Sequence, residues 1–357
     1  MAVLRTFRCP TPDGRDVAIT AVASAIPDLL RQTHVPGVSL ALVRDATVAS
    51  AVAWGLANLE PPQAVTTDTI FQGASLSKPL FAYAVLGLAA RERLDLDAPL
   101  TAYLLDPYVS NDPLLPAITA RRVLCHLTGW PNWRPEGGPL VRERTPGETF
   151  GYSGEGYNYL QAVVEHIVGQ PLDAYMHEAV LGPLGMAASS YRWAAPTDPR
   201  VARAHDHAGR PSAAYIGDRP EASSSLHTTP SDVARFLCAL LSPSTAAHLG
   251  APQLAAMLQP HVQLDNRVAW GLGWGLEDTD DGLAFWHWGD NPGFKSLVVA
   301  YPATQAGIVI MTNSDAGLGL CAHLVRAISG GDHPAFDWLA TTFYDTSTRG
   351  ALSHGSA

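Results

Sequence analysis

A serine and a lysine three residues apart, Ser75 and Lys78, stand at the start of a long apolar run. Nearly every residue from Phe81 to Ala90 is apolar, which predicts a buried helix, and Pro79 is tolerated only in its first turn. Residues three apart share a helix face, so we expect the Lys78 amine beside the Ser75 hydroxyl. A buried amine of lowered pKa could take the hydroxyl proton, which would make Ser75 a nucleophile. The alternative is a helix cap followed by a solvated lysine.

Two further segments carry side chains that can transfer protons. Tyr152 stands in a glycine-flanked turn that precedes a predicted helix, in the segment Phe150-Gly151-Tyr152-Ser153-Gly154. His287 stands at the end of a predicted strand, in the segment Trp286-His287-Trp288-Gly289, which Asp290 follows. Phenol and imidazole groups are common general acids and bases. With the Ser75-x-x-Lys78 motif, the two segments give three motifs in order along the chain.

The elements that must position these residues are strands at both ends of the chain and helices between them. The apolar spacing predicts a first helix, an antiparallel hairpin, a helical middle, further strands and a closing helix. This order favours an α+β fold in which an antiparallel sheet, built from both termini, is flanked by helices and carries an inserted, mostly helical domain. The elements with the clearest patterns are a helix at 21–33, strands at 38–43, 48–54, 270–276, 284–288, 295–301 and 306–312, and a helix at 318–328.

The same distribution predicts the domain organisation. Residues 1–80 and 226–345 are expected to form the sheet domain, and residues 81–225 the mostly helical one. The small, polar segment 346–357 predicts a disordered tail.

Composition excludes several classes of function. The chain has 357 residues, 47% hydrophobic and 16% charged, with a formal charge of −10, so neither a nucleic-acid footprint nor a membrane-binding surface is indicated. No apolar stretch is long enough to span a bilayer. The first ten residues lack the apolar run of a signal peptide, which predicts a cytoplasmic protein unless an export signal has been removed.

No metal or cofactor site is indicated. The four cysteines are scattered without a Cys-x-x-Cys pair, and His205-Asp206-His207 has no third ligand in sight, so this polar loop is expected to be solvated surface. His126, Trp130 and Trp133 could line the site, but the simpler interpretation is that they pack the loop that carries them.

The three motifs, taken together, resemble those of the serine β-lactamase and penicillin-binding-protein superfamily: Ser-x-x-Lys, Tyr-x-Asn, and Lys-Thr-Gly or its His-x-Gly variant. Flanking segments resemble recurring segments of the class-C-like branch in matching order. These are Pro36-Gly37-Val38-Ser39, Asp68-Thr69-Ile70-Phe71, Leu94-Asp95-Leu96-Asp97, His126-Leu127-Thr128-Gly129, Thr145-Pro146-Gly147 and Trp270-Gly271-Leu272-Gly273-Trp274.

The resemblance implies a role for each matching residue. Ser75 would attack an acyl carbonyl while Lys78 holds the proton network. Tyr152 would be the general base, either as a phenolate of lowered pKa or through Lys78, and would then protonate the leaving group. The backbone N–H groups of Ser75 and Asp290 would form the oxyanion hole. His287 would be a further catalytic group, Gly154, Trp288 and Gly289 would contact the substrate, and neither a metal nor a cofactor would be needed.

Two departures from the family pattern favour a carboxylesterase. Gly154 replaces the asparagine of Tyr-x-Asn, so the amide that would bond Lys78 and a substrate amide is missing. His287 replaces a permanently charged lysine with a group that ordinarily titrates near pH ~6.5. We therefore expect a serine hydrolase acting on small-molecule esters or amides, most simply a carboxylesterase.

Three alternatives stay open. A β-lactamase or a D-amino-acid-specific peptidase or amidase would use the same fold, and a non-catalytic protein of that fold could bind acyl groups or peptides.

The segment Gly73-Ala74-Ser75-Leu76-Ser77 also approaches the Gly-x-Ser-x-Gly elbow of α/β-hydrolases, but its last residue is serine. The helical middle does not provide the alternating strands and helices that fold requires.

Overall fold

The computed structural model describes residues 8–10, 16–104, 109, 112–193, 198–242, 249–280 and 282–344. The predicted tail at 346–357 lies outside these residues. Within the described ranges, no helix is both long and apolar enough to cross a bilayer.

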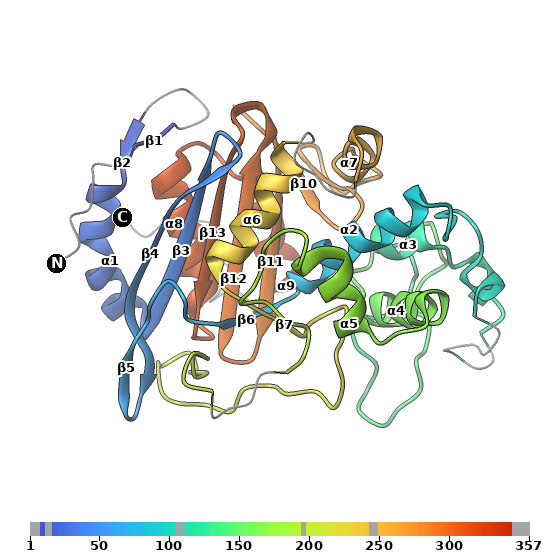
Figure 1. The fold of residues 1–357 in the computed structure, drawn as a ribbon, viewed down its shortest axis with the longest axis horizontal. Helices are drawn as coiled ribbons and strands as arrows, with labels where there is room; N and C mark the ends of the chain where they lie inside the picture. Colours follow the sequence, from blue (N-terminus) through green and yellow to red (C-terminus); the bar gives the residue numbers. More distant parts are fainter. Residues whose placement is uncertain are drawn as a thin grey trace.

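A nine-stranded antiparallel sheet forms the centre of the molecule, in the order β5-β4-β3-β13-β12-β11-β10-β9-β8 (Figure 1). This confirms the predicted α/β fold with an antiparallel sheet. The strands are β3 (Gly37–Arg44), β4 (Thr47–Leu59), β5 (Pro62–Ala64), β8 (Val262–Gln263), β9 (Val268–Trp270), β10 (Gly275–Thr279), β11 (Gly282–Asn291), β12 (Phe294–Tyr301) and β13 (Ala306–Thr312). Two short pairs of strands form separate two-stranded sheets. They are β1 (Arg8–Pro10) with β2 (Asp16–Ala18), and β6 (Phe71–Ala74) with β7 (Leu226–Thr228).

A strand from the N-terminal part of the chain pairs with one from the C-terminal part inside this sheet. Strand β3 pairs with β13 in a register that sets Val38 opposite Thr312 and Leu42 opposite Ile308. Both strands are mostly apolar, and all their residues except Arg44 are buried, because helices cover both faces of the sheet. Alternate residues of β13 therefore enter two separate cores, Ile308 and Ile310 on one face and Val309 and Met311 on the other.

Helices α1, α8 and α9 pack with the first of these faces, and α6 covers the other, where it lies in front of the sheet in Figure 1. Helices α2 to α5 lie to the side of the sheet, in the part of the chain between β6 and β7. The α-helices are α1 (Ile19–Thr33), α2 (Ser77–Ala90), α3 (Ala120–Leu124), α4 (Gly154–Val168), α5 (Leu172–Met176), α6 (Pro230–Leu241), α7 (Ala251–Met257), α8 (Gly317–Ser329) and α9 (Pro334–Phe343). Short 3₁₀ turns occupy Leu100–Ala102, Leu115–Ala117 and Pro302–Thr304, and a π-helical turn occupies His177–Leu181.

Residues of the types that commonly cap helices stand at the ends of α4 and α6. The side chain of Ser153 accepts a hydrogen bond from the backbone of Gly156 at the start of α4, and Gly169 ends that helix in the left-handed conformation. Thr229 caps α6 in the same way, ahead of Pro230. The domain boundaries predicted at 80/81 and 225/226 stay a prediction.

Two differences between the predicted elements and the structure bear on the site. The strand expected at 270–276 is two strands, β9 and β10, because Gly271 and Gly273 lie in a connection between them. Helix α9 was not predicted at all. It packs against β9 and β10, and its end brings Phe343 and Tyr344 to the side chains of Trp288 and Asp290.

Candidate active site

Ser75 lies in the turn that joins β6 to α2. The residue before it, Ala74, has a φ of 50°, a left-handed conformation that costs a non-glycine residue energy and is common near functional sites. The Ser77 hydroxyl holds this turn by donating a 2.6 Å hydrogen bond to the Ala74 carbonyl. Helix α2 begins at Ser77, two residues after the expected start, and the Lys78 N–H donates to the Ser75 carbonyl at 3.0 Å. The turn thus presents the half-buried Ser75 side chain just outside the helix.

Lys78 is fully buried, and its Nζ lies 2.9 Å from Ser75 Oγ and 2.8 Å from the backbone carbonyl of Ser223. Burial lowers the pKa of this amine from 10.5 to about 7, and the charge of Glu221 opposes the shift. The alternative of a helix cap followed by a solvated lysine is therefore wrong. At neutral pH a substantial fraction of Lys78 is an uncharged amine beside the Ser75 hydroxyl.

Tyr152 lies under this amine, with Lys78 Nζ 4.7 Å from the centre of its ring. Burial raises the pKa of the phenol well above its ordinary value, although the Ser75 side chain opposes this shift. The expectation of a phenolate with a lowered pKa is therefore not supported, because the phenol is the stable form. The Tyr152 hydroxyl is buried, and no described residue meets it at hydrogen-bonding geometry.

His287 is buried in β11 with its ring 6.2 Å from that of Tyr152. Its Nδ1 lies 2.7 Å from the Trp288 carbonyl, so Nδ1 carries the proton and Nε2 is left as an acceptor, without a partner among the described residues. Burial and the charge of Lys78 lower the pKa of His287 to about 3. The expectation that its charge would change near pH ~6.5 is therefore wrong. The imidazole stays neutral at physiological pH.

The end of β11 lies directly against β6, which explains Gly289. A Cβ at this position would stand 2.3 Å from the Gly73 carbonyl oxygen and 2.2 Å from Ser296 Oγ, so no larger residue fits. Asp290 follows within the same strand, and its carboxylate contacts Lys295 at 2.9 Å and the Tyr344 hydroxyl at 2.8 Å. Trp288 is buried with its ring 4.9 Å from that of Tyr152. The oxyanion role of the backbone N–H groups of Ser75 and Asp290 stays a prediction.

Gly154 also lies in close contact, in this case with an aromatic ring. A Cβ there would stand 2.7 Å from Cη2 of Trp133, and the backbone N–H of Gly154 donates to the Asn132 side chain at 2.9 Å. Trp133 is 47% exposed and lines a cleft of about 600 Å³, so it borders the cleft as well as packing against Gly154. Trp130 is fully buried, as the interpretation of loop packing expects.

Four residues around the catalytic groups were missed by the sequence-based predictions or not assigned to the site. Ser223 provides the carbonyl that holds Lys78, and its hydroxyl donates to Asn158 at 2.8 Å. Glu221 provides a negative charge that raises the pKa of Lys78 and so opposes the effect of burial. His126 is buried with its ring stacked 4.2 Å from that of Tyr152, and it adopts a φ of 56°. Only the His126 segment gave a signal in the sequence, because the others come from distant parts of the chain.

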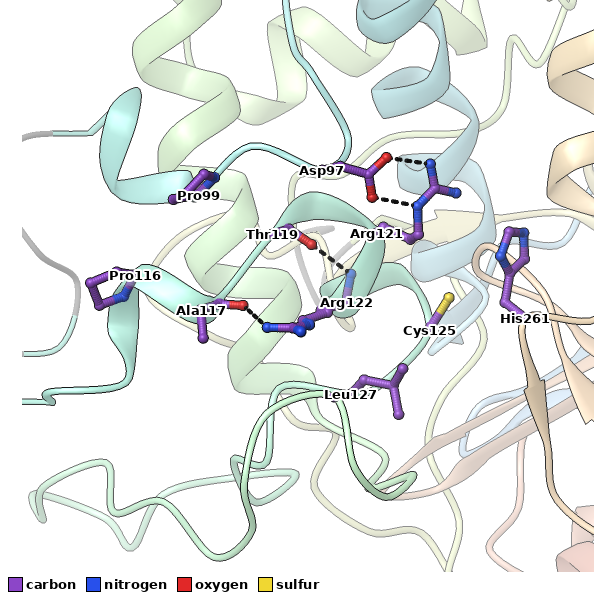
Figure 2. A pocket seen from close by; sticks show the side chains of 11 residues that line it. Asp97, Pro99, Pro116, Ala117, Thr119, Arg121, Arg122, Cys125, Leu127 and His261 are labelled. Atoms are coloured by element: carbon purple, nitrogen blue, oxygen red, sulfur yellow. Dashed lines mark hydrogen bonds and ion pairs between the residues drawn. The ribbon is translucent and has the colours of Figure 1, made fainter.

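A second cavity, of about 450 Å³, lies around the start of α3, and Figure 2 shows its lining residues. Its polar groups already bond one another: Arg121 holds Asp97 at 2.7 and 2.8 Å, and Arg122 donates to the Ala117 carbonyl. Burial raises the pKa of the Cys125 thiol to about 12, so this sulfur is not a nucleophile. The arrangement provides no catalytic group in this cavity.

The His205-Asp206-His207 segment differs from the expected solvated loop. His205 is fully buried, and its Nδ1 lies 2.9 Å from the Asn313 carbonyl, so it connects this loop to the end of β13. Asp206 forms an ion pair with Arg210 at 2.8 Å. Among the residues described, no group of three or more His, Cys, Asp or Glu side chains is arranged to hold a metal ion.

Similar proteins include hydrolases and penicillin-binding proteins. Esterase EstB of Burkholderia gladioli is 32% identical over 209 residues, which is 50% of this chain and only 53% of that relative. Penicillin-binding protein 4 of Amycolatopsis lactamdurans is 26% identical over 334 residues, or 85% of this chain and 87% of that protein.

Solved structures support the same fold. A class C beta-lactamase superimposes with a TM-score of 0.75 at 19% identity, over 88% of this chain and 97% of that enzyme. A penicillin-binding protein homologue from Pyrococcus abyssi gives a TM-score of 0.73 at 20% identity, over 87% of this chain and 77% of the other. These likenesses confirm the predicted class-C-like fold. The family model described as Beta-lactamase matches residues 22–327, so this chain belongs to the beta-lactamase family of serine hydrolases.

Proposed function

We propose that this protein is a carboxylesterase that acts on small esters through an acyl-enzyme on Ser75. The observation that carries the proposal is the environment of Lys78, a buried amine with a pKa of about 7 that lies 2.9 Å from Ser75 Oγ. A base with a pKa near the working pH accepts and returns protons most efficiently.

In the acylation step, Ser75 Oγ bonds to the acyl carbon of the ester as its proton passes to Lys78 Nζ. Negative charge then develops on the former carbonyl oxygen, and the backbone N–H groups of Ser75 and Asp290 stabilise it. The bond from the acyl carbon to the alcohol oxygen breaks next. The departing alkoxide takes a proton from Tyr152, which is a phenol at neutral pH, and Lys78 replaces that proton.

Deacylation reverses these roles with water. The water oxygen bonds to the acyl carbon while its proton passes to Lys78, which must again be uncharged. The bond between the acyl carbon and Ser75 Oγ then breaks. Ser75 recovers its proton and the carboxylic acid leaves.

Gly154 supports esters over amides and β-lactams. An asparagine at this position would offer an amide to the substrate, but here the Trp133 ring rests on the Gly154 backbone. An indole ring therefore stands where the family has a side-chain amide, and a substrate amide left without a hydrogen-bond partner there is costly to bury. The name of the relative EstB, an esterase, supports the same activity.

The test compares three substrate classes on one preparation: short and long p-nitrophenyl esters, a chromogenic cephalosporin, and D-amino acid amides. We expect at least one ester to have a kcat/KM well above that of either other class. A cephalosporin turned over as fast as the best ester would instead indicate a β-lactamase, and a D-amino acid amide would indicate an amidase.

A second measurement separates an enzyme from a binding protein of the same fold. A fluorophosphonate should label Ser75, and peptide mass analysis should locate the label. The matched control is Ser212→Ala, which removes the hydroxyl of an exposed serine outside the catalytic motifs. Label on another serine, or full ester hydrolysis by Ser75→Ala, would reject the acyl-enzyme.

A further inference from the structure

Two aromatic rings that are exposed to solvent line the cleft of about 600 Å³ beside the catalytic groups. Trp133 is 47% exposed and Tyr215 is 44% exposed, and they come from different loops. The cleft adjoins the active site because Asn158 and Asp290 also line it. Asn158 is bonded to the Ser223 residue that holds Lys78, and Asp290 follows Gly289. We call this space the aromatic cleft.

The Trp133 ring is held in the cleft by contact with the start of α4. Its Cη2 and Cζ3 atoms would lie 2.7 and 2.8 Å from a Cβ at position 154, so only glycine lets the indole rest on the backbone there. The neighbouring Asn132 accepts the backbone N–H of Gly154 through its side chain at 2.9 Å, which fixes the loop that carries Trp133. Gly154 and Trp133 therefore act as one unit.

Tyr215 is also held in place rather than loose on the surface. Its backbone carbonyl accepts a hydrogen bond from Gln72 at 2.8 Å, and its ring meets that of Trp193 edge to face, 5.3 Å away. Trp193 in turn donates to the Arg219 carbonyl at 2.8 Å. Rings that are already ordered lose little conformational entropy when a ligand packs on them.

The charges around the aromatic cleft largely cancel. Arg134 and Glu155 form an ion pair with a 2.6 Å contact, and Asp290 is paired with Lys295 at 2.9 Å. Arg219 and Glu221 add one charge of each sign. A net charge on the ligand would gain little here, so the cleft suits an uncharged group.

We propose that the aromatic cleft selects uncharged esters that carry a planar aromatic ring, which packs on Trp133 and Tyr215. The volume fits, since ligand pockets typically measure about 300–1,000 Å³. This inference rests on the proposed esterase function and names its substrate class. The ring can belong to the acyl group or to the alcohol, and the experiment distinguishes the two.

The test uses two matched substrate pairs in which only the planarity of the ring changes. Methyl phenylacetate and methyl cyclohexylacetate place the ring on the acyl side. Benzyl acetate and cyclohexylmethyl acetate place it on the alcohol side. We expect the aromatic member to have the higher kcat/KM in at least one pair, by about 10-fold, because a planar ring can stack on both aromatic side chains.

Trp133→Ala should bring that ratio close to one, mainly through a higher KM for the aromatic ester. The matched control is Leu283→Ala, which removes a 40% exposed apolar side chain at the end of β11 opposite Asp290 and should leave the ratio unchanged. Ratios within each variant cancel any general loss of activity.

A double-mutant cycle then tests the coupling of Gly154 to the ring. Gly154→Ala should lower the ratio in the parent, since the new Cβ displaces the indole, but should change it little in the Trp133→Ala background. An equal effect of Gly154→Ala in both backgrounds would show that Gly154 acts independently of Trp133.

Two kinds of failure can be told apart. If no ester of the panel is hydrolysed and fluorophosphonate does not label Ser75, the proposed function is wrong. If esters are hydrolysed but neither pair shows an aromatic preference, or Trp133→Ala keeps the preference, the aromatic cleft is wrong while the esterase stands.

Discussion

Two buried lysines, Lys78 and Lys295, lie in very different surroundings although both are close to the catalytic groups. Lys295 is 6% exposed and contacts two carboxylates, those of Asp290 at 2.9 Å and Asp315 at 2.7 Å. Lys78 is 0% exposed, and it has no carboxylate at ion-pair distance within the described part of the chain. Its neighbours are a hydroxyl, a carbonyl and the ring of Tyr152.

The difference separates a structural amine from a chemical one. Burying an ammonium group is costly unless an opposite charge accompanies it, so Asp290 and Asp315 make Lys295 a cross-link between β11, β12 and the start of α8. Lys78 lacks such compensation and gives up its proton more easily. The surroundings of the two lysines, rather than their burial, therefore assign their roles.

The largest expected effect is on catalysis by Lys78→Met. Removing the amine beside Ser75 should lower kcat/KM for esters by roughly 10³-fold, within the range for a general base. In the parent, kcat/KM should rise with pH through about 7, as Lys78 becomes uncharged. Lys295→Met is the matched control, and it should lose less than about 10-fold. Equal losses in the two variants would remove the distinction between the lysines.

The second largest effect on catalysis is expected for His287→Ala. It should reduce kcat for esters by roughly 10²-fold, because the unpartnered Nε2 is then no longer available to the proton network. Since the pKa of His287 is about 3, its loss should not move the pH dependence above pH 5. His287→Gln keeps a hydrogen-bonding side chain and should recover part of the rate. An alanine variant with parental kcat would assign His287 to packing alone.

Stability gives the opposite ranking for the two lysines, and the larger change is expected in Lys295→Met. Two carboxylates would be left without their cation, which should lower the free energy of unfolding by about 2 kcal/mol. The value is below that of a fully buried pair because both carboxylates are partly exposed. Asp315→Asn in the same background should restore part of the loss. Urea denaturation at pH 7 measures each change, and an unaltered midpoint would contradict the structural role.

Lys78→Met should instead stabilise the fold, because it removes the cost of burying the amine. The variant also loses the hydrogen bond to the Ser223 carbonyl, so the net gain in the free energy of unfolding should be about 1 kcal/mol at pH 6.5. In the parent, the folded pKa of about 7 lies below the unfolded value of 10.5, so the unfolded chain binds more protons between these values. Parental stability therefore rises with pH across this window, and the advantage of the variant should shrink by pH 9.5. A difference that does not depend on pH would argue against a lowered pKa.

The sequence predicted much of the fold because long apolar elements carry strong periodic signals. Strand β13 is apolar throughout and α2 is apolar on every side, and both were expected within a few residues of their observed bounds. The hairpin between β9 and β10 was missed because its four-residue connection, 271–274, lies within a run that reads as one strand. Helix α9 had a weak signal, Pro334 followed by Phe336 and Leu339, which no catalytic motif drew attention to.

The sequence predicted which residue types form the candidate site. It did not predict the burial and the hydrogen-bond partners of those residues. Local spacing brought Ser75 and Lys78 together, and the structure has them in contact. The carbonyl of Ser223 comes from a residue 145 positions away, and no local pattern indicates it. The state of Tyr152 depends on burial by rings from several elements, which raises its pKa where the family resemblance suggested a phenolate.

The pairing of β3 with β13 has a consequence for synthesis on the ribosome. Strand β3 emerges early, yet its partner between residues 306 and 312 is made only after some 260 further residues, so one edge of the β3–β4 hairpin stays open during that time. An apolar unpaired edge readily joins other strands, and contacts this distant in sequence form slowly. A nascent chain of this protein is therefore exposed to aggregation until its last strand arrives, and slower translation would lengthen that exposure.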